Sequence, residues 1–182
     1  TEEIRQRLKN GDLDIGILAT PLNDAALAEH VLFYEEFMMY ASEHENLPRK
    51  KFYVPKDINL DHLWLLQEGH CLRSQVLNLC MLKEEMNKSD NLSYGAGSIE
   101  TLIHLVDRQG GLTIVPRLAV EMMKPAQKRK LRIFAEPKPV REISLVAIKD
   151  YPRARLLELL NKAIIDALPA DKELKRKKVL EI

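Results

Sequence analysis

The two cysteines, Cys71 and Cys80, are the residues of this chain whose chemistry stands out, and they lie nine positions apart. Cys71 directly follows His70 and opens a stretch with the apolar periodicity of a helix. Unpaired amide groups and the dipole at a helix start stabilise an anion, and His70 and Arg73 add positive charge nearby. The sequence therefore predicts that Cys71 is a reactive thiol with a stabilised thiolate form.

The predicted helix restricts how the two cysteines can react with each other. Nine residues of intact helix separate two Cα atoms by roughly 13 Å along the axis. A disulfide needs Cα atoms within about 7 Å. If Cys71 and Cys80 bond, the helix between them must unwind at least in part, and the disulfide belongs to a second conformation of the segment.

Residue types alone leave three interpretations of the cysteine pair open: two inert buried thiols, a metal pair or a redox pair. The spacing is not CxxC, so neither a thioredoxin-type exchange site nor a compact zinc site is well supported. The remaining histidines share no ligand spacing with one another or with the cysteines; these are His30, His44, His62 and His104. We therefore expect no metal and no cofactor.

Composition indicates a soluble globular protein of one domain or two small ones, with 182 residues and 46% hydrophobic content. The 28 Lys and Arg against 27 Asp and Glu give a net charge of +1, so this stretch of chain offers no field that would hold a nucleic acid directly. There is no membrane-length apolar run and no signal-peptide pattern. We expect a cytoplasmic location without membrane contact, where the cysteines rest as thiols.

The first half of the chain alternates helix and strand patterns around the first cysteine. Residues 4–10 read as a helix closed by Gly11, and its position at the start of the chain suggests a missing upstream part. Strands are expected at 14–19, 31–34, 37–41 and 63–66, with a polar loop at 48–56 and the cysteine helix from Cys71. The acidic pair Glu35-Glu36 interrupts the second and third strands, which makes it a plausible crossing point between two lobes.

The second half continues the same alternation. Ser98 is a good N-cap for a helix that Gly110-Gly111 ends, and strands are expected at 112–115, 131–134 and 143–148. A last helix follows Pro152, with its inward face predicted to be Leu156, Leu160, Ala163, Ile164, Ala167 and Leu168. This order predicts an α/β protein with largely parallel sheets, in two lobes joined by two crossings.

Three segments carry a resemblance to a known family. Gly69-His70-Cys71-Leu72-Arg73-Ser74-Gln75, followed by Cys80, closely resembles the sensor segment of peroxide-responsive LysR-type transcriptional regulators, with both cysteines at that group's spacing. Residues 8–17 resemble the family's L-x-x-G-x-L-D stretch. Residues 98–102 and 110–116 resemble its S-x-E-T-L helix and G-x-G-I-x-x-x-P strand, so the resemblance covers nearly the whole chain.

The resemblance implies an α/β, periplasmic-binding-protein-like regulatory domain of two lobes, each a mostly parallel sheet flanked by helices. Lobe I would be residues 1–36 and 141–182, truncated at the N-terminus, and lobe II residues 37–140 with the redox segment 69–83. It also implies a non-enzymatic activator of antioxidant genes that forms a homodimer, with a tetramer in the full-length protein. Promoter DNA would bind through an absent N-terminal winged helix-turn-helix, and RNA polymerase would be a further partner.

The resemblance also assigns roles to individual residues. Cys71 matches the peroxidatic cysteine that reacts with hydrogen peroxide, and Cys80 matches the resolving cysteine that closes a disulfide. Thr1, His70 and Arg73 match residues that support the peroxide pocket. Ser74 departs from the Asp common in the motif, which puts the charge balance around Cys71 in doubt. The alternative is a LysR-type domain that senses a small metabolite between its lobes, with both cysteines incidental.

Overall fold

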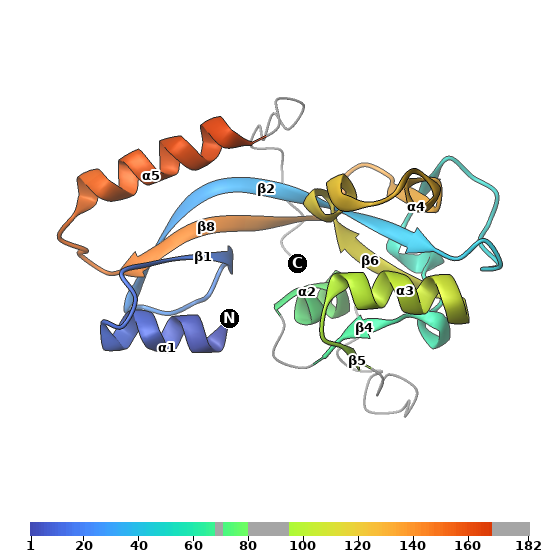
Figure 1. Ribbon diagram of the computed structural model, residues 1–182, viewed down its shortest axis with the longest axis horizontal. Helices are drawn as coiled ribbons and strands as arrows, with labels where there is room; N and C mark the ends of the chain where they lie inside the picture. The colour runs from blue at the N-terminus through green and yellow to red at the C-terminus, as the bar shows by residue number, and fades with distance from the viewer. Residues whose placement is uncertain (68–70, 80–94, 169–182) are drawn as a thin grey trace. The chain divides into compact units, whose positions relative to one another are not determined.

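The computed structural model describes residues 1–67, 71–79 and 95–168 (Figure 1). These residues form two compact units. Within the described ranges, unit 1 holds residues 1–35 and 141–168, and unit 2 holds the described residues between 36 and 140. Strand β2 (Leu27–Ala41) carries the chain from unit 1 into unit 2, and β8 (Val140–Ile148) carries it back.

Unit 1 begins with helix α1 (Glu2–Asn10), which ends at Gly11 in the left-handed conformation with φ of 78°. Strand β1 (Ile15–Thr20) then pairs antiparallel with β8, with Ile17 opposite Leu145. Helix and strands share an apolar cluster of Leu8, Leu18, Leu27 and Val146. The predicted first helix, its glycine cap and the first strand are thus confirmed.

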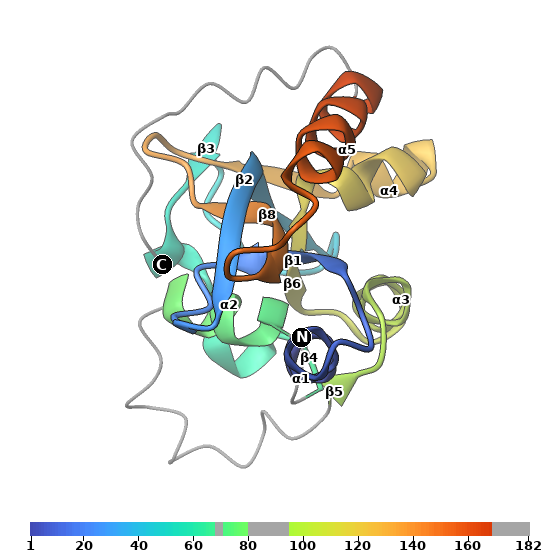
Figure 2. The ribbon, with the colours of Figure 1, turned by 90° about the vertical axis from the view of Figure 1, so that its left-hand side faces the viewer.

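Helix α5 (Ala154–Ala167) completes unit 1 and lies on the opposite side of the unit 1 strands from α1 (Figures 1 and 2). Only Leu157 of this helix is buried, and Leu156 is 43% exposed. The predicted inward face was therefore wrong at Leu156 and at the exposed Ala163 and Ala167. The helix contacts its unit along a narrower line that includes Leu157, Leu160 and Ile164, because residues three or four apart share one face.

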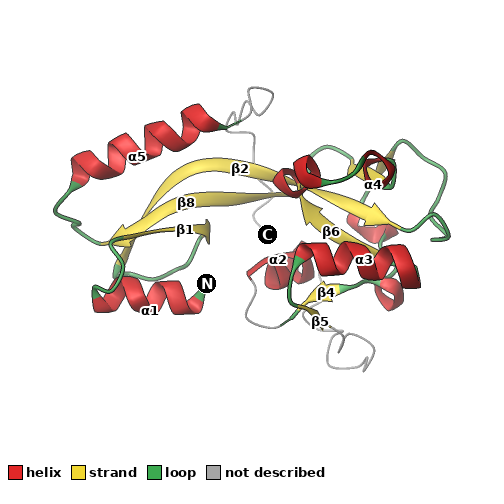
Figure 3. Cartoon of the chain, in the orientation of Figure 1, coloured by secondary structure: helices red, strands yellow, loops and turns green. Residues whose placement is uncertain are grey.

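In unit 2, β2 lies between β6 (Leu112–Pro116) and β7 (Leu131–Phe134), antiparallel to both. Figure 3 labels β2 and β6 of this sheet. The short β3 (Phe52–Tyr53) pairs parallel with β7, inside the stretch predicted as a loop. A second, two-stranded sheet joins β4 (Leu65–Leu66) and β5 (Gly95–Ala96) in parallel. The described strand pairs are thus mixed, not mostly parallel: β1–β8, β2–β6 and β2–β7 are antiparallel, whereas β3–β7 and β4–β5 are parallel.

Helices cover the unit 2 strands. Helix α3 (Ile99–Gln109) starts where the Ser98 hydroxyl accepts the Thr101 amide at 3.2 Å, as predicted, and α4 is the short Pro125–Lys128. Asp107 at the end of α3 accepts from Tyr40 at 2.6 Å and from Lys130 at 2.9 Å. Burial raises the pKa of Asp107, but these hydrogen bonds outweigh it and hold the pKa below its usual range. The network fixes α3 to the sheet.

The acidic pair does not break β2, contrary to the predicted interruption. Glu35 is 3% exposed and lies within one continuous 15-residue strand. Arg141 donates to Glu35 through two nitrogens at 2.9 and 2.8 Å, and Lys138 donates to Glu36 at 3.0 Å. A buried carboxylate is tolerated in a strand when a cation pairs with it. For Glu35 that cation is Arg141, which belongs to the returning strand β8.

In the ranges that the structure describes, no helix is long and apolar enough to cross a membrane.

Candidate redox site

Helix α2 (Cys71–Leu79) positions the candidate sensor cysteine. Its residues Leu72, Val76, Leu77 and Leu79 are buried, and they join the larger apolar cluster of unit 2. Alternation of these residues with polar ones at helical spacing drives this packing, and the predicted face of Leu72, Val76 and Leu79 is confirmed. The helix therefore stands on the core of unit 2 and presents its first residue, Cys71, at one end.

Arg73 ties the first turn of α2 to the neighbouring sheet. Its guanidinium Nη1 donates to the carbonyl oxygen of Leu66, the last residue of β4, at 2.9 Å. Beneath this turn Arg73, Leu72 and Val76 line a narrow void together with Trp64 and Thr113. The cation predicted to support Cys71 thus lies two residues from it and is held in place by a backbone acceptor.

Cys71 is a free, half-buried cysteine. Gln75 follows it by four residues, which places the two side chains on neighbouring positions of the same helix face. The Gln75 Oε1 atom is buried and has no hydrogen-bond partner among the residues that the structure describes. The sequence motif contains Gln75 without suggesting a role for it, although the i, i+4 spacing from Cys71 was the available signal. Helix α2 therefore carries a free cysteine and, four residues on, a buried acceptor that no described residue uses.

The remaining predicted site residues are placed differently. Cys80 and His70 lie outside the described residues. Thr1 lies in unit 1, at the N-cap position of α1, where its side chain makes no capping hydrogen bond. Ser74 is exposed on α2. Of the predicted set, Cys71 and Arg73 are the two described residues that share one helix, two positions apart, a spacing at which helical side chains do not face each other.

A family model described as the LysR substrate binding domain matches residues 1–169. This chain belongs to the LysR substrate-binding domain family. The match extends over both units, and it confirms the α/β, periplasmic-binding-protein-like fold expected from the sequence segments. The family is one of transcription regulators, and membership in it gives no reason to assign an enzymatic activity to this LysR domain.

Two relatives illustrate the range of the family. A hydrogen peroxide-inducible genes activator of Haemophilus influenzae is 30% identical over 166 residues, covering 91% of this chain and 54% of the relative. The HTH-type transcriptional regulator EstR of Acinetobacter baylyi is 30% identical over 154 residues, covering 84% of this chain and 50% of the relative. The LysR domain described here thus spans about half the length of these relatives.

A solved structure supports the same placement. The crystal structure of an OxyR mutant from Porphyromonas gingivalis superposes with a TM-score of 0.84 at 34% identity, covering 98% of this chain and 81% of that one. The fold of this LysR domain is therefore that of an OxyR regulatory domain.

Proposed function

We propose that this LysR domain is the hydrogen peroxide-sensing part of a transcription activator, and that the sulfur of Cys71 is the atom that reacts with peroxide. The observation that carries the proposal is the free, half-buried Cys71 at the start of helix α2, four residues before Gln75, whose buried Oε1 accepts no hydrogen bond from the described residues. A peroxide molecule at the thiol has an O–H group to donate, and Gln75 offers the acceptor that would orient it. The name of the Haemophilus influenzae relative, a hydrogen peroxide-inducible genes activator, supports the same substrate.

The chemistry is a two-electron oxidation in two steps. The Cys71 thiolate attacks one peroxide oxygen, the O–O bond breaks, and the products are the Cys71 sulfenic acid and hydroxide, which takes up a proton as water. The Cys80 thiol then condenses with the sulfenic acid, forming the S–S bond and releasing a second water. One hydrogen peroxide is reduced to two waters and two thiols become one disulfide. No metal or cofactor takes part.

The residues around Cys71 would act as support. Arg73 fixes the first turn of α2 through the Leu66 carbonyl and keeps a positive charge near the developing anion. We assign His70 and Thr1 to the peroxide pocket on the strength of the sequence motif, and Cys80 to the resolving role. We also propose that unit 1 corresponds to regulatory lobe I and unit 2 to regulatory lobe II.

Disulfide formation would act as a switch because of helix α2. The helix runs from Cys71 to Leu79 and so occupies almost the whole interval to Cys80. A disulfide cannot span an intact helix of this length, so the packed residues of α2 would leave their positions when it forms. In the full-length protein we propose that this change alters a homodimer or tetramer, and through it promoter DNA binding and contact with RNA polymerase.

The proposal is tested by trapping the first intermediate. Wild-type protein and the variants Cys80→Ser and Cys71→Ser are treated with half an equivalent of hydrogen peroxide and then with a sulfenic-acid label, and analysed by mass. We expect a disulfide in the wild type, a label on Cys71 in Cys80→Ser, and neither product in Cys71→Ser. Absence of both products at this peroxide dose would reject the redox function and favour the alternative of a metabolite-sensing domain.

The role of Gln75 is tested separately by the rate of the first step. Loss of one hydrogen bond corresponds to a several-fold to about tenfold slower reaction, which we expect for Gln75→Leu. Ser74→Ala, a neighbouring exposed position where the substitution changes no charge, is the matched control and is expected to react at the wild-type rate. Equal rates for both variants would remove Gln75 from the proposal without affecting Cys71.

A further inference from the structure

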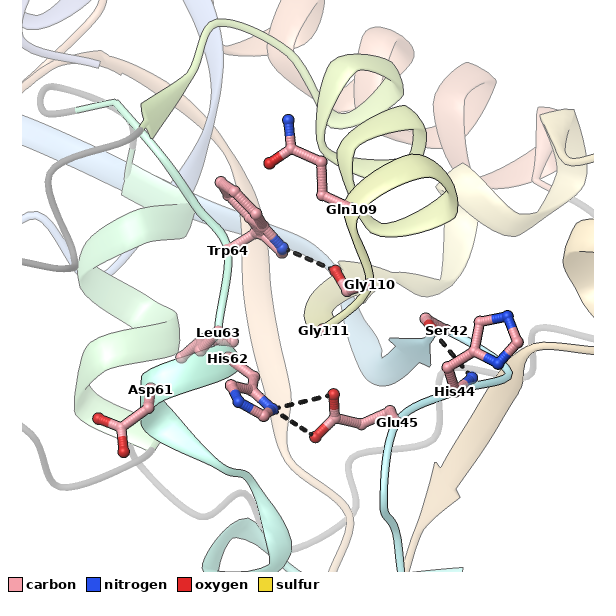
Figure 4. Close-up of a pocket in the computed structure, with 10 residues that line it drawn as sticks. All are labelled: Ser42, His44, Glu45, Asp61, His62, Leu63, Trp64, Gln109, Gly110 and Gly111. Atoms are coloured by element: carbon pink, nitrogen blue, oxygen red, sulfur yellow. Dashed lines mark hydrogen bonds and ion pairs between the residues drawn. The ribbon is translucent and has the colours of Figure 1, made fainter.

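Unit 2 contains a cavity of about 350 Å³ that shares no residue with the redox proposal. Its walls come from the loop after β2, from residues 61–64 and from the end of α3 with the two glycines that follow (Figure 4). Cavities of this size are at the lower end of the range that holds small organic ligands.

Glu45 contributes a buried carboxylate to the lining of this cavity. Its side chain is only 4% exposed, and its two oxygens lie 3.0 and 3.2 Å from Nδ1 of His62. An ionised carboxylate offers about four acceptor positions, whereas His62 supplies a single hydrogen. Among the described residues no other side chain or amide donates to Glu45. A buried carboxylate with acceptor positions left unfilled favours a further N–H donor that carries a positive charge.

The other walls of the cavity select the kind of cation. None of the described residues that line it is a lysine or an arginine, and the Asp61 carboxylate and the His44 ring point away from Glu45 (Figure 4). Within the described residues no three His, Cys, Asp or Glu side chains are placed to hold a metal ion. Leu63 and the Trp64 indole add apolar surface. A ligand that fits these walls is an organic cation with a short apolar part.

Backbone geometry keeps the cavity in shape. Gly111 has a φ of 83°, and a Cβ atom at this position would lie 2.5 Å from the carbonyl oxygen of His62. The Trp64 indole N–H donates to the Gly110 carbonyl at 2.9 Å. The approach of the glycine pair to residues 62–64 is therefore fixed by contacts that tolerate no side chain, and the wall that carries His62 and Trp64 does not depend on a ligand.

We infer that this cavity is a binding site for a primary ammonium group on a short aliphatic chain, with the ammonium donating to Glu45 and the chain against Leu63 and Trp64. The inference goes beyond the redox function and does not depend on it.

Trp64 makes the site directly observable, because it is the sole tryptophan of the chain. Its fluorescence is recorded while n-butylammonium chloride is added, with sodium chloride at equal ionic strength and 1-butanol as the salt control and the neutral isostere. We expect a saturable change with n-butylammonium alone. No saturable change, or the same change with 1-butanol, would overturn the site.

Two variants test the role of the carboxylate. Glu45→Gln, which can still accept from His62, is expected to weaken n-butylammonium binding at least about tenfold, the effect of losing a hydrogen bond to a charged group. Glu43→Gln, an exposed neighbour outside the cavity lining, is expected to bind within about twofold of wild type. Unweakened binding by Glu45→Gln would refute the inference. If circular dichroism shows that Glu45→Gln does not fold, the comparison of amine with alcohol in the wild type decides.

Discussion

Substituting Val76 by Ala should make the sensor easier to oxidise, because Val76 is buried in helix α2 and packs only while that helix is in place. Val76 is 3% exposed and lies in the middle of the helix, away from both cysteines in sequence. If disulfide formation displaces α2, the packing of this side chain contributes to the reduced form alone. Its truncation then raises the free energy of the reduced form relative to the oxidised form.

The size of the effect follows from the burial of the side chain. Val→Ala removes two carbon groups at about 0.8 kcal/mol each, and the cavity left behind brings the cost to roughly 2 kcal/mol. For a two-electron couple about 30 mV corresponds to 1.4 kcal/mol, so we expect a midpoint potential about 40 mV more negative. The matched control is Val106→Ala in α3, a position that is 0% exposed in the same unit. It should destabilise both redox forms equally and leave the potential unchanged.

The assay is equilibration of each variant in a series of reduced and oxidised glutathione mixtures, followed by acid quenching and mass analysis of the disulfide fraction. A midpoint for Val76→Ala equal to those of wild type and Val106→Ala would mean that α2 is equally packed in both redox forms. That result would refute the switch, even with the disulfide present.

Three further outcomes are expected. Deuterium exchange of the α2 amides should accelerate after oxidation while α5 stays protected, and unchanged α2 exchange in a sample with the disulfide would contradict the unwinding. The Arg5 hydrogen bond holds the pKa of Asp24 at about 2, so the ionised carboxylate stabilises the fold above the ordinary carboxyl range near pH 4, and this stabilisation is lost as the pH falls toward 2. The urea midpoint of Asp24→Asn should therefore be lower than that of the wild type at neutral pH and should depend less on pH between about 4 and 2. An unchanged dependence of the midpoint on pH in this window would exclude Asp24 as the origin. Gly111→Ala should lower the free energy of unfolding by at least about 2 kcal/mol through backbone strain and steric overlap. Gly97→Ala, with open space around the glycine, should change that free energy by less than about 0.5 kcal/mol. Equal denaturation midpoints for the two variants would show that the close contacts of Gly111 do not limit stability.

Local signals in the sequence were sufficient for most elements. The Ser98 cap and the Gly11 stop depend on hydrogen bonds and backbone conformations within a few residues, and both are confirmed. The apolar face of α2 is likewise confirmed, because the periodicity of one helix is contained in its own residues. The cysteine motif, a pattern of adjacent residues, led to the family that the comparisons establish.

The predicted features that failed depend on partners distant in sequence. A strand through Glu35 and Glu36 looked unfavourable because their cations, Arg141 and Lys138, lie about a hundred residues further along the chain. The contact line of α5 could not be chosen from periodicity, since its helix carries apolar residues on more than one side and the neighbouring strands decide which are covered.

The sequence by itself determined the family, most of the helices and strands, and the candidate sensor Cys71, since each of these depends on neighbouring residues. Only the tertiary structure decided that the Gln75 acceptor is buried and unused by the described residues, and that Glu45 meets His62 within a cavity. Burial and hydrogen-bond satisfaction are properties of the surroundings of a side chain, and those surroundings are assembled from segments that folding brings together.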